Sequence, residues 1–227
     1  MCDIDLRTKT LLGDDFSKLQ NKKVAVVGLG GVGSIIPLTL VRTGIKRLII
    51  IDKDKVEYNN LNRQIAYDLD DVNEYKASAL KKKLLKIRSN IEILEISKSI
   101  DVNFTFSIFD DCDFVVDCID DIKAKVELTK YCVEHNINFV SSLGMGNRID
   151  PSKIFITKLN KTIGCPLAKK FRYMLKKENV EISNINVAFS SEEPIIKNKV
   201  VSSVAFAPNA AGLNISSFVI KTLIGWW

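Results

Sequence analysis

Apolar residues along the chain fall into short runs separated by longer amphipathic stretches. Runs rich in β-branched side chains predict strands at residues 24–28, 47–52, 91–96, 113–119 and 138–143. Helical periodicity predicts helices between them at residues 33–43, 73–88 and 122–135. Gly44 fits the end of the first helix, and Asn73 fits the N-cap of the second. Strands that alternate with helices predict a parallel sheet with helices on both faces.

The pattern changes after Gly146. Further strands are expected at residues 153–159, 184–190 and 202–207, and helices at residues 166–178 and at the end of the chain. There is no internal repeat and no low-complexity linker. The sequence therefore predicts a single domain over residues 1–227. Its fold class is α/β, with a Rossmann-like, doubly wound, mainly parallel sheet that a mixed C-terminal part extends.

The 227 residues are 46% hydrophobic and 26% charged, which is ordinary for a globular protein. Basic residues exceed acidic ones by 33 − 27 = 6, an excess that suits a polyanionic partner without requiring one. Two uncharged stretches, residues 24–41 and 201–220, reach about 18 residues, the length of a membrane span. Their glycines, prolines and asparagines favour buried strand-turn-helix segments, so we expect no membrane span.

Cysteine usage indicates a reducing compartment. The chain has five cysteines, an odd number without a C-x-x-C pair, which disfavours a disulfide framework or a four-thiolate zinc site. We therefore expect a cytoplasmic protein. Cys165 precedes the helix expected at residues 166–178, where thiol pKa values fall, so it is a candidate acyl or sulfur acceptor. A buried small residue is the alternative for this cysteine.

A glycine-rich loop follows the first strand and opens the first predicted helix, the context that a G-x-G-x-x-G phosphate loop requires. Asp52, at the end of the second strand, is placed to accept hydrogen bonds from ribose hydroxyls, and Asp54 completes a D-x-D pair. The pattern predicts a bound nucleotide without choosing between NAD, FAD and ATP, and a tightly packed turn is the alternative. The glycines of the loop are Gly28, Gly30, Gly31 and Gly33.

The stretch NNLNRQ at residues 59–64 favours ATP among these nucleotides. Arg63 supplies a positive fork that suits a triphosphate, and Asn60 and Gln64 supply amides beside it. Lys76 is expected in the first turn of the next helix, where its ammonium adds to the helix dipole. A protein that holds NAD has little use for these additional phosphate binders. Taken singly, Arg63 or Lys76 would pass for a solvated surface charge.

Aspartates cluster at the end of the fourth predicted strand, where open α/β sheets place their ligands. Asp120 is predicted to hold Mg²⁺ against the phosphates, because this ion prefers hard oxygen ligands. Asp120 and Asp121 fit equally well as the N-cap of the helix that starts near Ile122. The two roles can belong to different members of the pair.

With these residues in order, the chain resembles the ThiF/MoeB/HesA superfamily of adenylating enzymes. The motifs that carry the resemblance are GLGGVGS, D-x-D, N-x-x-R-Q, the following Lys76 and D-C-I-D. The likeness covers essentially the whole chain and is strongest to the TcdA (CsdL/YgdL) branch, the tRNA threonylcarbamoyladenosine dehydratases. The stretches specific to that branch are Arg7-Thr8 before Leu-Leu-Gly, GMGNRIDPSKI, KTIGCPLAKKFR, FSSEEP and SVAFAPNAAG.

The resemblance implies an ATP-dependent, magnesium-assisted dehydration of a modified adenosine beside a tRNA anticodon. The free carboxylate of threonylcarbamoyladenosine attacks the α-phosphate, pyrophosphate leaves, and the carbamoyl oxygen then closes a ring and expels AMP. The implied contacts are Asp52 and Asn60 for the ribose, Arg63 and Lys76 for the phosphates, and Asp120 for magnesium. Arg7 would reach into the site of the partner subunit in a homodimer, or else be a terminal surface charge.

The partners expected are therefore tRNA, a second copy of the chain and, as a further candidate, a sulfurtransferase. Arg148, in a glycine-flanked loop, is a candidate contact for the tRNA substrate, and residues 81–88 form a second basic run. Basic runs on helices are also typical of solvated faces. The candidate nucleic-acid contacts on the helix after Cys165 are Lys169, Lys170 and Arg172.

Three alternatives remain. Activation of the C-terminus of a sulfur-carrier or ubiquitin-like protein is the nearest, but relatives with that activity commonly carry paired C-x-x-C motifs, which are absent here. An NAD-dependent oxidoreductase is supported only by the glycine loop and Asp52. A nucleotide-sensing or tRNA-binding module without catalysis is disfavoured by the intact phosphate-site residues.

Overall fold

The computed structural model describes residues 3–101, 103–196 and 201–226. The strands of these residues form a seven-stranded sheet in the order β3-β2-β1-β4-β5-β7-β6. Neighbouring strands run parallel except β6 and β7, which pair antiparallel. This arrangement confirms the predicted α/β fold with a mixed C-terminal extension. The strands are β1 (Lys23–Val27), β2 (Arg47–Ile51), β3 (Glu92–Ile96), β4 (Phe114–Asp117), β5 (Phe139–Ser142), β6 (Ile154–Lys158) and β7 (Asn186–Ser190).

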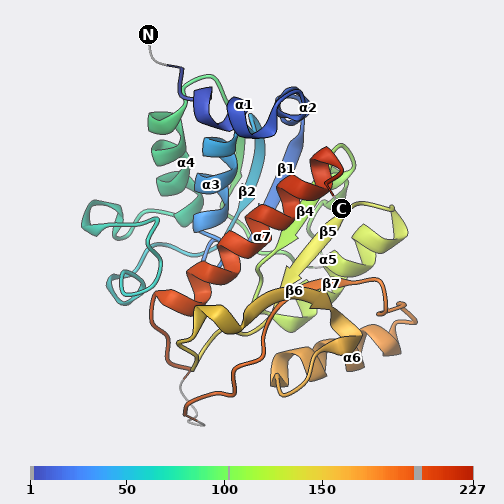
Figure 1. Cartoon of the computed structure of the whole chain (residues 1–227). Coiled ribbons are helices and arrows are strands. Elements are labelled where there is room, and N and C mark those ends of the chain that lie inside the picture. The colour runs from blue at the N-terminus through green and yellow to red at the C-terminus, as the bar shows by residue number, and fades with distance from the viewer. Residues whose placement is uncertain (1–2, 102, 197–200, 227) are drawn as a thin grey trace.

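Helices cover both faces of the sheet (Figure 1). The α-helices are α1 (Leu6–Leu12), α2 (Asp15–Leu19), α3 (Ile35–Thr43), α4 (Lys76–Ile87), α5 (Ile122–Glu134), α6 (Pro166–Lys177) and α7 (Phe206–Ile224). Helices α3, α4 and α7 share a core on one face, whereas α5 packs on the other and contacts α6. The 3₁₀ helices are η1 (Tyr58–Asn60), η2 (Leu69–Asp71), η3 (Phe106–Phe109), η4 (Pro151–Lys153) and η5 (Leu159–Lys161).

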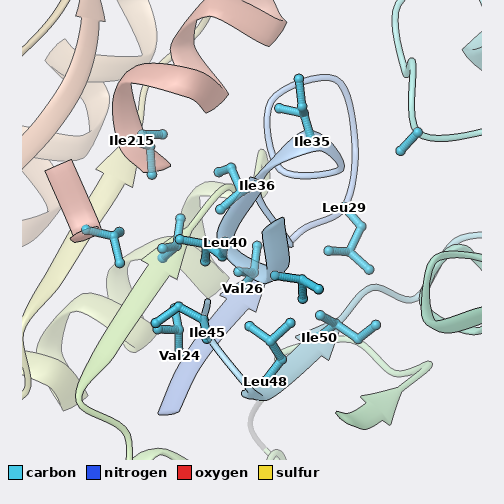
Figure 2. Close-up of a cluster of buried hydrophobic side chains, with 14 of the residues drawn as sticks. Val24, Val26, Leu29, Ile35, Ile36, Leu40, Ile45, Leu48, Ile50 and Ile215 are labelled. Atoms are coloured by element: carbon cyan, nitrogen blue, oxygen red, sulfur yellow. The ribbon is translucent and has the colours of Figure 1, made fainter. Parts of the chain in front are cut away.

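The uninterrupted apolar runs of the central strands follow from this two-sided cover. Along β1, Val24 and Val26 face the core shared with α3 and α7, whereas Ala25 and Val27 face the core under α5. Because both faces are buried, polar positions do not alternate with apolar ones. Figure 2 shows the first core, where Leu40 of α3 and Ile215 of α7 gather over the strands. Helix α7, near the C-terminus, thus completes the core that packs on β1.

The strand order places a topological switch point next to the glycine loop. Strand β1 lies between β2 and β4, so the chain winds outward from β1 in both directions. At such a switch point the loops after the two strands separate at the carboxyl edge, where open α/β sheets bind ligands. The loops after β1, β2 and β4 therefore carry the residues of the candidate site.

Two local predictions were wrong. Residues 202–207 form no strand: residues 201–204 are irregular and α7 begins at Phe206. The carbonyl of Ser203 accepts a hydrogen bond from a side chain, Asn62 Nδ2, rather than from a neighbouring strand. Asn73 is not the N-cap of α4. It takes a left-handed conformation with φ 74° and pairs its amide with the Val56 carbonyl, and Tyr75 precedes the helix.

Other local predictions are confirmed. Gly44 ends α3 and donates its amide to the carbonyls of Leu40 and Val41. The uncharged stretch at residues 24–41 contains β1, the glycine loop and most of α3, as expected. Among the described residues, no helix has both the length and the apolar character that crossing a bilayer requires.

Candidate functional site

The glycine loop between β1 and α3 leaves no room for a side chain at two of its positions. Gly28 has φ 87°, and a Cβ placed on it would lie 2.6 Å from the Cys118 carbonyl oxygen. A Cβ on Gly33 would overlap the carbonyl oxygen of Gly28. The loop is therefore a cradle of bare backbone at the start of α3, where free amides and the helix dipole favour phosphate.

Asp52 connects the end of β2 to this loop. Its Oδ2 accepts a hydrogen bond from the Leu29 amide at 2.6 Å, and its Oδ1 accepts one from the Asp54 amide at 2.8 Å. Burial raises the pKa of Asp52, while the charge of Lys76 and the two amides act in the opposite direction. Each carboxylate oxygen keeps a lone pair, so Asp52 can hold the loop and still accept from a ribose hydroxyl.

The NNLNRQ stretch folds into a turn that places Arg63 against the glycine loop. Arg63 Nη1 donates to the Asn59 carbonyl at 3.0 Å and to Asn62 Oδ1 at 2.9 Å. Arg63 Cδ lies 3.8 Å from the position that a Cβ on Gly31 would occupy. Arg63, which is half-buried, thus lies beside the glycine loop, and its contact with phosphate stays a prediction.

Asn60 serves the turn itself. It is buried, its Oδ1 accepts from the Glu57 amide at 3.2 Å, and its Nδ2 donates to Asn59 Oδ1 at 2.6 Å. The predicted contact of Asn60 with ribose or phosphate stays a prediction, because its amide is occupied by neighbours within the turn.

Lys76 is the first residue of α4, and its side chain is only 7% exposed. Its Nζ forms an ion pair with Asp54 Oδ2 at 3.2 Å, and its charge also acts on Asp52. Tyr67, which the sequence analysis did not single out, donates from its hydroxyl to the Leu29 carbonyl at 3.0 Å. These contacts bring the D-x-D pair, the helix start and the glycine loop into one cluster.

Three buried side chains around this cluster carry polar atoms without a hydrogen-bond partner. Among the described residues, these atoms include Ser34 Oγ, Gln64 Oε1 and Asn209 Oδ1. Gln64 Nε2 lies 3.9 Å from the Cβ position of Gly30, which places its amide against the loop. Buried polar groups normally find partners, so these atoms are compatible with a ligand beside the glycine loop. Three more atoms of this kind among the described residues are Glu74 Oε2, Arg88 Nε and Thr129 Oγ1, so the unpaired atoms add to the case made by the loop geometry and do not define a site by themselves.

Asp120 and Asp121, which follow the carboxyl end of β4, have different environments. Asp121 is the N-cap of α5, and its Oδ1 accepts from the amides of Lys123 at 3.0 Å and Ala124 at 2.9 Å. Asp120 is exposed and has no hydrogen bond or ion pair within the described part of the chain. The carboxylate of Asp120 is therefore available to a cation.

A buried polar network lies under this segment and was missed by the sequence analysis. Asp117 Oδ2 accepts from Lys125 Nζ at 2.8 Å and from the Ser141 hydroxyl, and its Oδ1 accepts from the Ile119 amide at 3.0 Å. Lys125 Nζ also donates to Ser141 Oγ at 3.0 Å and to the Ser142 carbonyl at 3.1 Å. Lys125 and Asp117 are fully buried. The network ties α5 to the carboxyl ends of β4 and β5.

A cavity of about 530 Å³ opens beyond Asp52, at the carboxyl ends of β2 and β3. It begins at Lys53 and continues along residues 96–99 to Phe104 and Ile108. Its volume is in the range of small-ligand pockets. A group attached to a ribose at Asp52 would have space there.

Arg7 lies at the opposite edge of the sheet. Helix α1, which carries it, is tied down by an ion pair between Asp5 and Arg88, a residue that follows α4 just before β3 begins. In Figure 1, α1 lies beside α2, which leads into the start of β1. The structure therefore does not bring Arg7 to the site of its own chain.

Two of the candidate RNA contacts face inward. Arg148 is 6% exposed, and its guanidinium donates to the carbonyls of Glu192, Gly144 and Gly146. This burial contradicts a surface role, so Arg148 orders the loop after β5 instead. Arg172 donates to the carbonyl and hydroxyl of Thr162. Lys169 and Lys170 of α6 are exposed.

The thiols near the site differ in exposure. Cys165 is 5% exposed, whereas Cys118 is of intermediate exposure, and burial raises the pKa of the Cys118 thiol. Among the described cysteines, Cys112, Cys118, Cys132 and Cys165 are free. Within the described residues, no group of three His, Cys, Asp or Glu side chains is arranged to hold a metal.

Together, the switch point of the sheet, the bare glycine cradle and the basic groups beside it define a nucleotide-binding α/β protein of the Rossmann-like class. The chain belongs to the ThiF family, whose model matches residues 5–226.

Named relatives refine this assignment. The chain is 34% identical over 226 residues to the tRNA threonylcarbamoyladenosine dehydratase of Bacillus subtilis, covering 91% of this chain and 88% of the relative. It is 37% identical to tRNA threonylcarbamoyladenosine dehydratase 2 of Saccharomyces cerevisiae, covering 81% of this chain but only 42% of the yeast protein. The crystal structure of the Escherichia coli dehydratase TcdA in complex with ATP matches with a TM-score of 0.90 at 28% identity, covering 96% of this chain and 93% of that one.

Proposed function

We propose that this protein is an ATP-dependent tRNA threonylcarbamoyladenosine dehydratase built as a single adenylation domain. The observation that carries the proposal is the cluster of glycine loop, Asp52, Arg63 and Lys76 at the switch point. The cluster occurs in a chain that is 34% identical over 226 residues to a dehydratase of that name. The substrate and the reaction are taken from the relatives. The site supplies the groups that the reaction needs.

We expect ATP to lie across the cluster in one orientation, with its base toward β3 and its phosphates toward α3. Asp52 accepts from the ribose, and the base enters the cavity that starts at Lys53. The phosphates follow the glycine loop toward α3, where Arg63 and Lys76 balance their charge. The unpaired amide oxygens of Gln64 and Asn209 can accept hydrogen bonds from hydroxyl or amino groups of the nucleotide.

The chemistry needs positioning and charge neutralisation rather than a covalent nucleophile. A carboxylate oxygen of the modified adenosine forms a bond to the α-phosphorus, and the bond to the pyrophosphate oxygen breaks. The carbamoyl oxygen then bonds to the acyl carbon while the bond to AMP breaks, AMP carries away the carboxylate oxygen, and a carbamoyl N–H releases its proton to solvent, so the substrate loses one water in total. Arg63 stabilises the charge that develops on the phosphates, and the buried thiols take no part.

Asp120 is the residue placed to hold Mg²⁺. Its exposed carboxylate lacks a protein partner within the described ranges, and Mg²⁺ is commonly bound by one or two carboxylates together with substrate phosphates. When bound, the ion would neutralise charge on the phosphates. Asp121 is excluded from this role by its engagement as the cap of α5.

A homodimer would explain the position of Arg7. Its exposed side chain lies at the edge opposite its own site, so it reaches a nucleotide only in another copy of the chain. We propose a cytoplasmic location, which a tRNA-modifying role supports. A sulfurtransferase is a further candidate partner, to be tested by co-purification.

For tRNA, the exposed Lys169 and Lys170 on α6 are the supported contacts. Arg172 is engaged with Thr162, and Arg148 is buried, so neither presents a free guanidinium to a backbone phosphate. Contacts of lysine with phosphate would make tRNA binding weaken with salt, whatever the tRNA sequence.

The test is mass spectrometry of nucleosides after incubation of the protein with Mg·ATP and threonylcarbamoyl-modified tRNA. We expect a product lighter by one water, with AMP formed, and no product with Arg63→Ala. Pyrophosphate exchange with a carrier protein ending in glycine, without any change in the tRNA, would instead establish the sulfur-carrier alternative. Binding of ATP without either activity would contradict the proposed substrate.

A further inference from the structure

The side chain of Asn62 joins two parts of the chain that are far apart in sequence. Its Oδ1 accepts a hydrogen bond from Arg63 Nη1 at 2.9 Å. Its Nδ2 donates to the carbonyl of Ser203, 141 residues later, also at 2.9 Å. Asn62 lies in the NNLNRQ stretch between Asn60 and Arg63, but neither nucleotide binding nor helix capping accounts for it.

The segment before and at the start of α7 holds Arg63 from a second side. Asn209 Nδ2 donates to the backbone carbonyl of Arg63 at 2.8 Å. Pro208 lies 3.3 Å from the Cβ position of Gly31, so the same segment also touches the phosphate cradle. Both the side chain and the backbone of Arg63 are therefore connected to residues 203–209.

These contacts fix one side of the guanidinium and leave the other side open. Nη1 is engaged by the Asn59 carbonyl and Asn62 Oδ1. Within the described part of the chain, no hydrogen bond occupies Nε or Nη2 of Arg63. Those two nitrogens form the planar fork with which arginine binds phosphate oxygens in pairs. Arg63 is thus oriented before a nucleotide arrives, so its side chain loses less conformational entropy when the nucleotide binds.

We propose that Asn62 is a positioning residue for the phosphate arginine, and that through Asn62 the segment 203–209 sets the orientation of Arg63. The proposal rests on the proposed function for one point, namely that Arg63 meets the triphosphate. Asn62 is exposed, so its two hydrogen bonds contribute little to the stability of the fold. Their effect is expected in nucleotide binding.

Isothermal titration of the full chain with Mg·ATP and, separately, with adenosine tests the proposal. Asn62→Ala should raise the dissociation constant for Mg·ATP about 3- to 10-fold, the loss that follows from one or two ordinary hydrogen bonds. Its affinity for adenosine should not change, because adenosine lacks the phosphates that Arg63 is proposed to bind. The matched control is Asn90→Ala, an exposed asparagine before β3 at the opposite edge of the sheet.

A double-mutant cycle separates positioning from a general structural role. In the Arg63→Ala background, Asn62→Ala should cause no further loss of Mg·ATP affinity, since the residue through which it acts is absent. Additive losses, or an equal loss for adenosine, would overturn the proposal. Thermal unfolding of each variant without nucleotide checks that the fold is retained.

Two further outcomes distinguish this inference from the function on which it rests. If Arg63→Ala weakens Mg·ATP binding but Asn62→Ala does not, the inference fails while the phosphate role of Arg63 stands. If Arg63→Ala binds Mg·ATP as well as the unmodified protein does, the phosphate role fails, and the positioning role fails with it.

Discussion

Two polar clusters lie at the same edge of the sheet, and they differ in how completely their groups are satisfied. Around the glycine loop, Ser34, Gln64 and Asn209 keep unpaired buried atoms, and Arg63 keeps an open fork. Under the end of β4, Lys125 donates to three oxygens and its partner Asp117 accepts from three donors. The first cluster lacks partners that a ligand can supply, whereas the second is complete.

The difference distinguishes the proposed binding site from a structural element with similar residues. Unpaired buried groups cost free energy, so a fold that keeps several of them together is adapted to a ligand. A fully satisfied network becomes rigid and holds its surroundings in one arrangement. Both clusters contain a basic residue beside an aspartate, so residue type alone does not tell them apart. The following predictions test this distinction.

The largest effect on stability is expected for Lys125→Met, which leaves Asp117 buried without its cation. The free energy of unfolding should fall by about 3–5 kcal/mol, as for other buried ion pairs that lose one partner. Urea unfolding measures it, and Lys123→Met, an exposed lysine on the same helix, is the control. A loss no greater than that of the control would show that the network does not hold the fold together.

Arg63→Ala should have the opposite profile, with a large effect on activity and a small one on stability. Loss of a charge-stabilising group is expected to slow AMP formation with modified tRNA by about 10²- to 10³-fold. Unfolding in urea should be nearly unchanged, because the guanidinium is half-exposed. Arg42→Ala, an exposed arginine on α3, is the control. Loss of activity together with global unfolding would contradict the assignment of Arg63 to the binding cluster.

Asp5 and Arg88 form a second buried ion pair, at the opposite edge of the sheet, in which Arg88 Nε has no hydrogen-bond partner among the described residues, and it tests whether a paired charge acts on stability there as well. Asp5→Asn should lower the free energy of unfolding by about 1.5–3 kcal/mol near neutral pH, the range for hydrogen bonds to charged groups. The Arg88 guanidinium lowers the folded-state pKa of Asp5 below its ordinary value of 3.8. The stabilisation is therefore present above pH 3.8 and is lost as the pH falls through the lower, folded-state pKa.

Urea unfolding at a series of pH values measures the difference in the free energy of unfolding between Asp5→Asn and the unmodified protein. The curves of Asp5→Asn and the unmodified protein should converge in acid, and a difference that is independent of pH would contradict the ion-pair explanation. Asp3→Asn, which removes an exposed ion pair with Lys9, should have a smaller effect.

The smallest effect is expected for exposed charges that belong to neither cluster. Lys169→Glu with Lys170→Glu should leave unfolding unchanged and reduce the slope of log affinity for tRNA against log salt by about 1 per lost phosphate contact. Filter binding at several salt concentrations measures the slope, with Lys18→Glu on α2 as the control. An unchanged slope would remove α6 from the tRNA surface.

Strands and the glycine loop were predictable because local patterns determine them. β1 and β2 are short apolar runs rich in β-branched residues, and Gly28 and Gly33 lie where a Cβ does not fit. The failures were at places where remote contacts override local preference. Residues 202–207 form a short, mostly apolar run, yet the Ser203 carbonyl is paired with Asn62, and Asn73 completes a turn with Val56 rather than capping a helix.

Local sequence patterns are enough to predict the sheet, the position of the glycine loop and the groups beside it, because apolar period and glycine spacing act over a few residues. Which charged groups are satisfied depends on contacts that form only in the folded chain. Arg148 and Lys125 resemble surface charges in sequence but are buried among oxygens, whereas Arg63 keeps an open fork. Burial and hydrogen-bond partners come from segments far apart in the chain, such as Arg63 and Asn209, 146 residues away, and folding alone brings them together.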